Sequence, residues 1–213
     1  SINAMIYIRG SAYDYDEWEK MGFKGWGFDS MLKYFKRSQK QLRSKDKINQ
    51  DFIKKIESFK AEMERKGYTP SSTVLNFEVV EAPIEVAVAL NLPVHTDVIS
   101  LKRLRSADKE PIVIAQTYLP YSSCKNVLDY DMNNQSLYKI LSKNINTKIN
   151  KVVRNIEAVI PTKEDCEILE ITKTTAIQVF HYIGYNKFET PIEYTISRYR
   201  GDKNIFTIEQ YLE

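Results

Sequence analysis

The sequence has few of the residues on which most catalytic and metal sites are built. It contains only two histidines, His95 and His181, and two cysteines, Cys124 and Cys166. Their spacing fits neither a zinc site nor a disulfide framework, and no GxGxxG, Walker, HExxH or CxxC motif is present. We therefore expect no catalytic residue, no metal ligand and no cofactor, and we expect free thiols in a reducing cytoplasm.

Long apolar runs are also absent. The longest ones, such as IEVAVALNL, fall well short of the roughly 20 residues that a membrane-spanning helix needs, and no secretory signal is visible. The net charge of +3 on 213 residues is too small to indicate nucleic acid binding by itself. These absences predict a cytoplasmic protein with no membrane contact.

Glycine and tryptophan are scarce and unevenly placed. Both tryptophans, Trp18 and Trp26, and four of the seven glycines fall within the first 30 residues. The chain then becomes rich in Lys, Ile and Asn, and the lysine-rich stretch KRSQKQLRSKDK separates the two styles. We therefore predict a foreign-looking head (residues 1–40), a linker and helix (residues 41–70), and a main domain (residues 71–213).

Apolar periodicity after residue 47 predicts both helices and strands. Helical spacing of Phe52, Ile56, Phe59 and Met63 predicts a helix within residues 49–68, ended by Gly67. Shorter helices are predicted within residues 82–92, 135–144 and 162–170. Strands are predicted within residues 73–82, 98–105, 112–120, 149–160, 176–185, 192–200 and 204–212. Because most strand connections resemble hairpins, we predict an α+β fold: a mainly antiparallel sheet with flanking short helices.

The strand LKRLR carries two arginines with a common orientation. Because side chains alternate along a strand, Arg103 and Arg105 share one face. Two neighbouring guanidinium groups repel each other unless an anion or a carboxylate lies between them, and their donors suit a phosphate or a carboxylate. The alternative is a solvated outer face on which a glutamate of the neighbouring strand pairs with them.

Two further strands have polar faces by the same alternation. One face has Gln116 and Tyr118, and the other has Glu193, Thr195, Ser197 and Tyr199. Convergent polar groups of this kind can line a ligand pocket on a sheet. The alternation alone leaves open whether these faces meet.

Several separated phrases of the chain resemble one known family. In order they are MERKGYTPSSTVLNFEVVEAP, ALNLPVHTDVISLKRLRSADKEPIVIAQTYLP, SLYKIL, NIEAVIP and PIEYTISRYRGDKNIF. From about residue 48 to the end, the chain resembles the UTRA domain, the effector-binding domain of HutC-type GntR-family transcription regulators. The resemblance implies a chorismate-lyase-like fold, a homodimer, and a small-molecule effector bound between the sheet and the helices. Sugar phosphates are common effectors in that family; amino acid derivatives and fatty acids also occur.

The resemblance implies residues that hold an anionic group of the effector. Arg103 and Arg105 match positions that grip an anion. Ser136 and Tyr138 of the SLY phrase match positions where hydroxyls and a backbone amide approach a phosphate. Such a group would lie near the start of a helix, where backbone N–H groups favour anions.

Other matching positions concern the rest of the effector. Glu193 and Tyr199 match pocket positions near a sugar, and Gln116 and Tyr118 complete the expected ligand-binding set. The chain departs from the family at Ala115, because AQTYLP stands where members often have a glutamate. Either a polar contact to the effector is missing, or Gln116 replaces it from the other face. A dimerisation module with a degenerate pocket is therefore one alternative function.

The resemblance favours a sensor of a transcriptional repressor over an enzyme. Regulators of this type have an N-terminal winged helix-turn-helix, and no such pattern precedes residue 48. We therefore expect DNA contact only through a domain that is absent from this chain. Effector binding would act by changing the geometry of the dimer.

The first 38 residues resemble an internal piece of glucose–methanol–choline oxidoreductases that lies near the flavin. The matching phrases are SINAMIYIRGSAYDYDEW and GWGFDSMLKYFKRSQ. The dinucleotide fingerprint and the histidine-bearing C-terminal domain of that family are missing, so we infer no flavin binding. We interpret the head as a fused or mis-joined segment. The alternatives are a fragment related to a choline-dehydrogenase-like flavoenzyme and a genuine module that packs on the sensor domain.

Limited proteolysis distinguishes a merely fused head from a docked one. For a fused segment we expect rapid trimming to near Lys45, because nothing protects its backbone. Protection of the head would contradict this and would show packing through its aromatic side chains, Trp18, Trp26, Tyr34 and Phe35.

Overall fold

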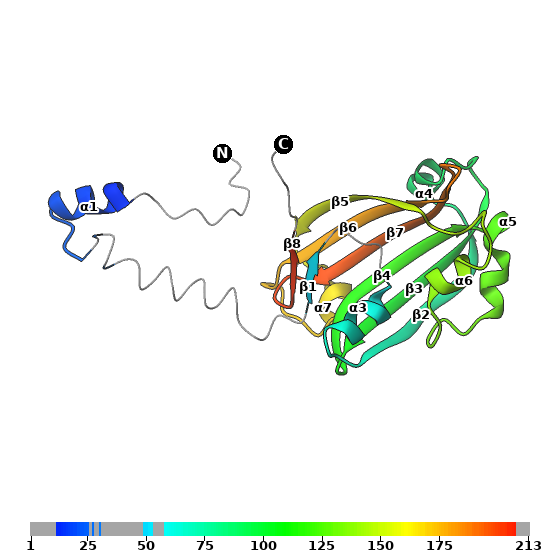
Figure 1. Cartoon of the computed structure of the whole chain (residues 1–213), viewed down its shortest axis with the longest axis horizontal. Coiled ribbons are helices and arrows are strands. Elements are labelled where there is room, and N and C mark those ends of the chain that lie inside the picture. Colours follow the sequence, from blue (N-terminus) through cyan, green and yellow to red (C-terminus); the bar gives the residue numbers. More distant parts are fainter. Residues whose placement is uncertain (1–11, 26, 28–29, 31–48, 53–57, 208–213) are drawn as a thin grey trace. The chain divides into compact units, whose positions relative to one another are not determined.

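The chain divides into two compact units, Ser1–Lys47 and Ile48–Glu213. The computed structural model describes residues 12–25, 27, 30, 49–52 and 58–207. In the first unit it describes the helix α1 (Ala12–Lys20), which is followed by a turn with Gly22 at φ 106° (Figure 1). Trp18 of α1 is 41% exposed, whereas Trp26, Tyr34 and Phe35 lie outside the described residues.

A six-stranded antiparallel sheet forms the centre of the second unit (Figure 1). Its strand order is β2-β3-β4-β7-β6-β5, and every neighbouring pair is antiparallel. The six strands are β2 (Pro70–Glu81), β3 (Asp97–Ala107), β4 (Glu110–Pro120), β5 (Lys151–Val159), β6 (Ile177–Tyr185) and β7 (Pro191–Arg200). The predicted α+β fold class with a mainly antiparallel sheet is confirmed.

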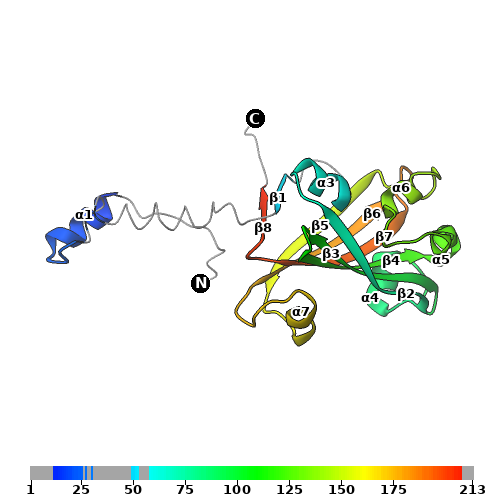
Figure 2. The same cartoon turned by 90° about the horizontal axis from the view of Figure 1, so that it is seen from below.

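Short helices lie on both faces of the sheet. Figure 2 shows α3 (Phe59–Arg65) and α6 (Leu137–Leu141) on one side, and α4 (Ile84–Ala89) and α7 (Lys163–Ile168) on the other. We call the first side the cavity face and the second the outer face. Odd-numbered side chains of β3, β4 and β7 point to the cavity face. Because both sides are covered, the central strands β3 and β4 are buried along most of their length.

Apolar clusters occupy the two ends of the cavity face. One cluster joins β3 and β4 to α6, to α5 (Tyr121–Cys124) and to the 3-10 helix η1 (Lys125–Asp129). At the other end, the fully buried Met63 of α3 packs against Ala107, Ile112 and Val113. These clusters hold α3 and α6 apart from each other, and the face between them is polar.

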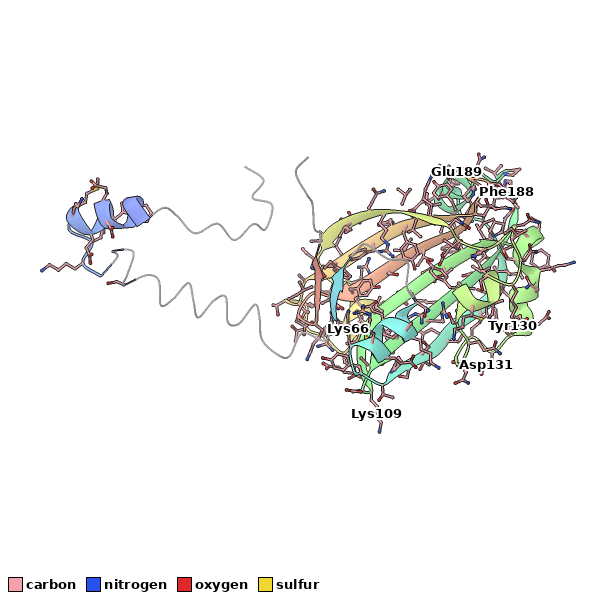
Figure 3. All side chains as sticks on the ribbon, in the orientation of Figure 1. Lys66, Lys109, Tyr130, Asp131, Phe188 and Glu189 are labelled. Atoms are coloured by element: carbon pink, nitrogen blue, oxygen red, sulfur yellow. The ribbon has the colours of Figure 1, made fainter. Side chains whose placement is uncertain are left out.

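The strands β3 and β4 are joined by a tight hairpin turn. Asp108 and Lys109 are its two central residues, with φ of 48° and 69°. Positive φ at both positions matches the primed turns that suit twisted strands. The Asp108 carboxylate accepts a hydrogen bond from the Thr69 backbone N–H at 2.8 Å, which ties the turn to the start of β2. Lys109 projects from the tip of this hairpin (Figure 3).

The helix predicted within residues 49–68 is wrong at its start. Asn49–Phe52 forms a strand, β1, that pairs in parallel with β8 (Asn204–Thr207). The helix α3 begins after Ser58, whose hydroxyl accepts a hydrogen bond from the Ala61 backbone N–H at 3.3 Å. Pairing with a distant strand overrides the local helical spacing, and residues 53–57 lie outside the described residues. No helix that the structure describes is long and apolar enough to cross a membrane.

The helix α7 is held to the outer face by one buried carboxylate. Asp165 is 2% exposed and forms a capping box with Thr162. Its two carboxylate oxygens also accept bonds from Nε and Nη2 of Arg198, both at 2.7 Å. Burial raises the pKa of Asp165, but the hydrogen bonds from Arg198 and Thr162 lower it by more, so it lies below the ordinary value.

We expect Asp165→Ala to lower the free energy of unfolding by about 2–4 kcal/mol, because a helix cap and a bidentate partner are lost together. Urea unfolding measures this change, and Thr162→Ala, which removes only the cap hydroxyl, should cost about 1 kcal/mol. Since the pKa of Asp165 is lower in the folded state, its stabilisation is present above pH ~4 and is lost as the pH falls further. Equal stability of Asp165→Ala and the wild type at pH 7 would contradict this assignment.

Candidate functional site

A cavity of about 270 Å³ lies on the cavity face, between the two apolar clusters. Its floor is made by five strands of the sheet, and its walls come from α3, the start of β2, and the segment that leads into α6. The floor side chains are Arg103, Arg105, Val113, Ala115, Thr117, Arg154, Phe180, Tyr182, Glu193, Ser197 and Tyr199.

Strand register brings these residues together. Arg103 lies opposite Ala115, which lies opposite Ser197, which in turn lies opposite Phe180. Directly opposed residues have neighbouring side chains on the same face of a sheet. The face carrying Arg103 and Arg105 therefore meets the face carrying Glu193 and Tyr199 in one cavity, a point that the sequence alone left open.

Of the two arginines of β3, Arg103 is buried in the floor and Arg105 is half-buried there, and neither forms an ion pair with a described carboxylate. Arg103 is 2% exposed, and its Nε lacks a hydrogen-bond partner among the described residues. Burial, and then the charge of Arg105, lower the pKa of Arg103 to about 9, so its guanidinium still carries its charge at neutral pH. No described carboxylate forms an ion pair with either residue, which differs from the predicted alternative of a solvated face with a glutamate partner.

Arg105 is held in place by contacts other than opposite charge. Its Nη1 donates to the Ser72 hydroxyl at 3.3 Å, and its guanidinium lies 5.3 Å from the ring centroid of Phe59 on α3. Burial lowers the pKa of Arg105 as well. The strand and the helix therefore orient a guanidinium that no described carboxylate pairs with directly, and the Glu193 carboxylate offsets its charge only in part.

Two other arginines of the same sheet, Arg198 and Arg200, are paired. Arg198 binds Asp165 as described above, and Arg200 lies 2.8 Å from an Asp202 oxygen and 3.3 Å from a Glu110 oxygen. The fold thus places carboxylates beside arginines that point away from the cavity. The unpaired arginines are those in its floor.

Glu193 is the acidic residue of the floor, and it is 1% exposed. Its Oε1 accepts a hydrogen bond from the Thr195 hydroxyl at 2.9 Å, and Oε2 has no partner of normal geometry among the described residues. Burial raises the pKa of Glu193, while Thr195 and the nearby Tyr138 hydroxyl act in the opposite direction. Gly184 lies directly opposite, and a Cβ there would sit 3.3 Å from Oε2, so this glycine leaves room for the carboxyl.

Ser136 and Tyr138 reach the cavity wall from the start of α6. Ser136 is the N-cap of that helix, and its hydroxyl accepts from the Lys139 backbone N–H at 3.5 Å. The preceding turn is organised by Asp131, whose carboxylate accepts three hydrogen bonds from Asn133 and Asn134. Asn133 in turn accepts a bond from a backbone N–H of β2 at 2.8 Å. Figure 3 shows Asp131 at the same end of the unit as α6.

Gln116 and Tyr118 do not belong to the cavity, which corrects the sequence-based expectation. Both are even-numbered residues of β4, so they point to the outer face, and neither lines the cavity. Gln116 donates to the Ser100 hydroxyl at 2.9 Å, and Tyr118 packs beside α4. Ala115 does line the cavity floor, and Gln116 cannot replace a side chain there because the sheet lies between them.

Sequence reasoning missed Arg154, Phe59 and the segment 133–135 of the cavity wall. Alternation along the predicted strand 149–160 shows which residues share a face with Arg154. It does not show which strand lies beside this one, so it could not place Arg154 in the cavity. His181 is a hydrogen-bonded sheet residue of the outer face, 3.1 Å from the Tyr194 hydroxyl and 3.2 Å from a Glu157 oxygen. Within the described ranges no three acidic, histidine or cysteine side chains gather as metal ligands.

The fold is of α+β type, and its cavity has arginine side chains in the floor. The UTRA domain model matches residues 65–204, so this chain belongs to the UTRA domain family, the effector domains of GntR-family regulators. The chain is 24% identical over 170 residues to the transcriptional repressor NagR of Bacillus subtilis, covering 80% of this chain and 68% of that protein. The effector domain of PhnF from Mycobacterium smegmatis has the same fold, with a TM-score of 0.70 at 21% identity over 76% of this chain and 99% of that one.

The N-terminal residues match a different family. The GMC oxidoreductase model matches residues 1–79, which confirms the resemblance of the head and extends it beyond residue 38. The oxygen-dependent choline dehydrogenase of Vibrio vulnificus is 48% identical over 46 residues, which are 22% of this chain and 8% of that enzyme. So short a piece of the enzyme carries no argument for its activity.

Arg103→Met tests whether the floor is built for a ligand rather than for stability. Because the charge is buried, unpaired and close to Arg105, we expect its removal to leave the free energy of unfolding unchanged or to raise it by about 1 kcal/mol. Urea unfolding in buffer free of phosphate and sulfate measures this. The matched control Arg198→Met leaves Asp165 unpaired and should cost about 2–3 kcal/mol. A comparable loss for both variants would overturn the interpretation of Arg103.

Proposed function

We propose that this chain is the effector-sensing part of a GntR-family transcriptional repressor and that it binds a small anion, foremost a phosphorylated sugar. The observation that carries this proposal is the pair Arg103 and Arg105, which are neighbours on one face and form no ion pair with a described carboxylate, Glu193 of the same floor attracting them only from a distance. An anion between two guanidinium groups removes their repulsion and accepts charge-assisted hydrogen bonds. Bidentate donors of this kind suit phosphate oxygens.

The remaining cavity residues fit the polar body of such an effector. The hydroxyl groups of Ser136 and Tyr138 can donate hydrogen bonds to the anion from the cavity wall. Glu193 can accept a hydrogen bond from a hydroxyl or amine through its unpartnered Oε2, and Tyr199 can pack against a sugar ring. A volume of about 270 Å³ is near the lower end of small-molecule sites, roughly 300–1,000 Å³.

Two alternative functions receive less support. A dimerisation module with a degenerate pocket would fill the cavity with its own side chains. Here the floor has the short side chain of Ala115, and a cavity of about 270 Å³ remains. A flavoenzyme would need the rest of the choline dehydrogenase chain, of which 8% is matched. The regulators that the chain matches are named as transcription regulators, not as enzymes.

In an intact regulator, the effector would act through a homodimer on DNA-binding domains outside this chain. A ligand shifts such an equilibrium only through its different affinity for two states. The chain covers 68% of NagR and 62% of the regulator GgaR from Escherichia coli, so the DNA contact is proposed for the regulator as a whole.

A thermal-shift screen tests the proposal. The panel contains hexose 6-phosphates, the matching free hexoses, inorganic phosphate, sulfate, amino acids and short fatty acids. A hexose phosphate at 100 times its dissociation constant should stabilise the fold by about 2.7 kcal/mol, whereas the free hexose should not. Stabilisation by free hexoses alone would contradict an anion site built on arginine, and stabilisation by fatty acids alone would contradict a phosphorylated sugar as the ligand.

Arg105→Gln should weaken binding of the best phosphorylated ligand by about 1.5–3 kcal/mol, because it removes charge-assisted hydrogen bonds. Isothermal titration calorimetry measures the loss. Lys109→Gln is the matched control, since it removes one positive charge from the exposed tip of the same hairpin (Figure 3). Equal affinity of Arg105→Gln and the wild type would remove Arg105 from the site.

A further inference from the structure

A third arginine, Arg154, lines the cavity from the opposite edge of the sheet. Arg154 is a half-buried residue of the edge strand β5, and it lies opposite Tyr182 of β6. Tyr182 lies opposite Thr195, and Thr195 lies opposite Thr117, so one row of paired residues leads from Arg154 across the floor. Arg103 belongs to the adjacent row, through Ala115 and Ser197.

Arg154 approaches the cavity from the opposite side to Arg103 and Arg105. Four strand-to-strand steps separate β3 from β5 in the order of the sheet. Neighbouring strands lie about 4.8 Å apart, so the backbones of these arginines are well separated and their side chains converge on the cavity from two sides. Tyr182 lies between them, with the Arg154 guanidinium 5.7 Å from its ring centroid.

The charge of Arg154 is not neutralised by the residues around it. No carboxylate of the described residues forms an ion pair with it, and Glu157 on the same strand points to the outer face, where it bonds to His181. Three guanidinium groups and the carboxyl of Glu193 line the floor, and Glu62 of α3, which pairs with Lys66, lines the wall. Arg154 therefore offers a separate guanidinium, four strand-to-strand steps away from Arg103 and Arg105, to a second anionic group.

We propose that Arg154 forms a second anion subsite, and that the effector carries two separated anionic groups. This inference rests on the proposed function, because it assumes that the first group occupies the Arg103–Arg105 pair. A phosphorylated sugar acid has the required chemistry: a phosphate at one end, a carboxylate at the other, and hydroxyls between them for Glu193. A carboxylate suits a guanidinium through paired hydrogen bonds, as a phosphate does.

Titration calorimetry with matched ligand pairs tests the second subsite. Each pair is a hexose 6-phosphate and the 6-phosphoaldonate of the same configuration, in the gluco, manno and galacto series, at constant ionic strength. For the wild type we expect the phosphoaldonate of the best pair to bind at least about tenfold more tightly, as a charge-assisted bond provides. Arg154→Gln should abolish that preference, and Arg154→Lys should retain much of it.

The control variant is Lys151→Gln. Lys151 lies on the same strand, is exposed, and pairs with Glu189 on the side away from the cavity. Its removal changes the net charge as Arg154→Gln does, so the preference for phosphoaldonates should persist. Far-ultraviolet circular dichroism and urea unfolding of each variant confirm that it is folded before titration.

The outcomes separate this inference from the function on which it rests. If the hexose phosphate binds as tightly as its phosphoaldonate, or if Arg154→Gln weakens both equally, the second subsite is wrong while the anion site stands. Equal weakening would mean that all three arginines hold a single phosphate. If no member of any pair binds the wild type, the proposed phosphorylated-sugar site fails and the inference falls with it.

Discussion

The site depends on one electrostatic constraint: two guanidinium groups are held side by side under a layer of helices, and no described carboxylate forms an ion pair with either, although Glu193 attracts both from a greater distance. Alternation along β3 forces Arg103 and Arg105 onto the same face, and burial makes their repulsion more costly than it would be in water. Such an arrangement persists only if the surrounding sheet is stable enough to hold it. In the function proposed here, an anion would supply the missing partner, and relief of this repulsion would become part of the affinity for the ligand.

The two faces of the sheet differ in how completely their side chains are packed and paired. On the outer face, apolar side chains of β4 and β6 pack against residues of the α7 region, and Asp165 pairs with Arg198 with good geometry. On the cavity face, apolar packing is confined to the ends, and the centre keeps polar groups with incomplete partners. Because neighbouring residues of a strand point to opposite faces, each central strand serves both purposes at once. Ser197 and Arg198 of β7 show this directly.

The sequence predicted the sheet well because alternation and turn residues are local properties. It also placed Arg103 with Arg105, and Glu193 with Tyr199, on common faces. It could not say that these faces meet, because strand order depends on long-range pairing. The same limit explains the errors. Gln116 and Tyr118 are polar and share a face, but it is the outer one, and only the register with β3 and β7 shows this. The helical spacing before α3 predicted a helix, but residues 49–52 pair with β8 instead. Arg154 lines the cavity because β5 pairs with β6, and the sequence of β5 alone does not show that pairing.

The cavity is connected by direct contacts to the strand pair at the beginning of the second unit. Phe206 of β8 lines the cavity, and its ring lies 4.2 Å from that of Phe180 and 5.1 Å from that of Tyr199, centroid to centroid. The neighbouring backbone of β8 pairs with β1, where the described part of this unit starts. A ligand that packs on Tyr199 would therefore contact an aromatic cluster that includes Phe206 of β8. Sensing requires that the ligand prefer one of two positions of such an element, since equal affinity for both would shift nothing. The β1–β8 pair lies outside the six-stranded sheet, and the aromatic rings of Phe206, Phe180 and Tyr199 join it to the cavity.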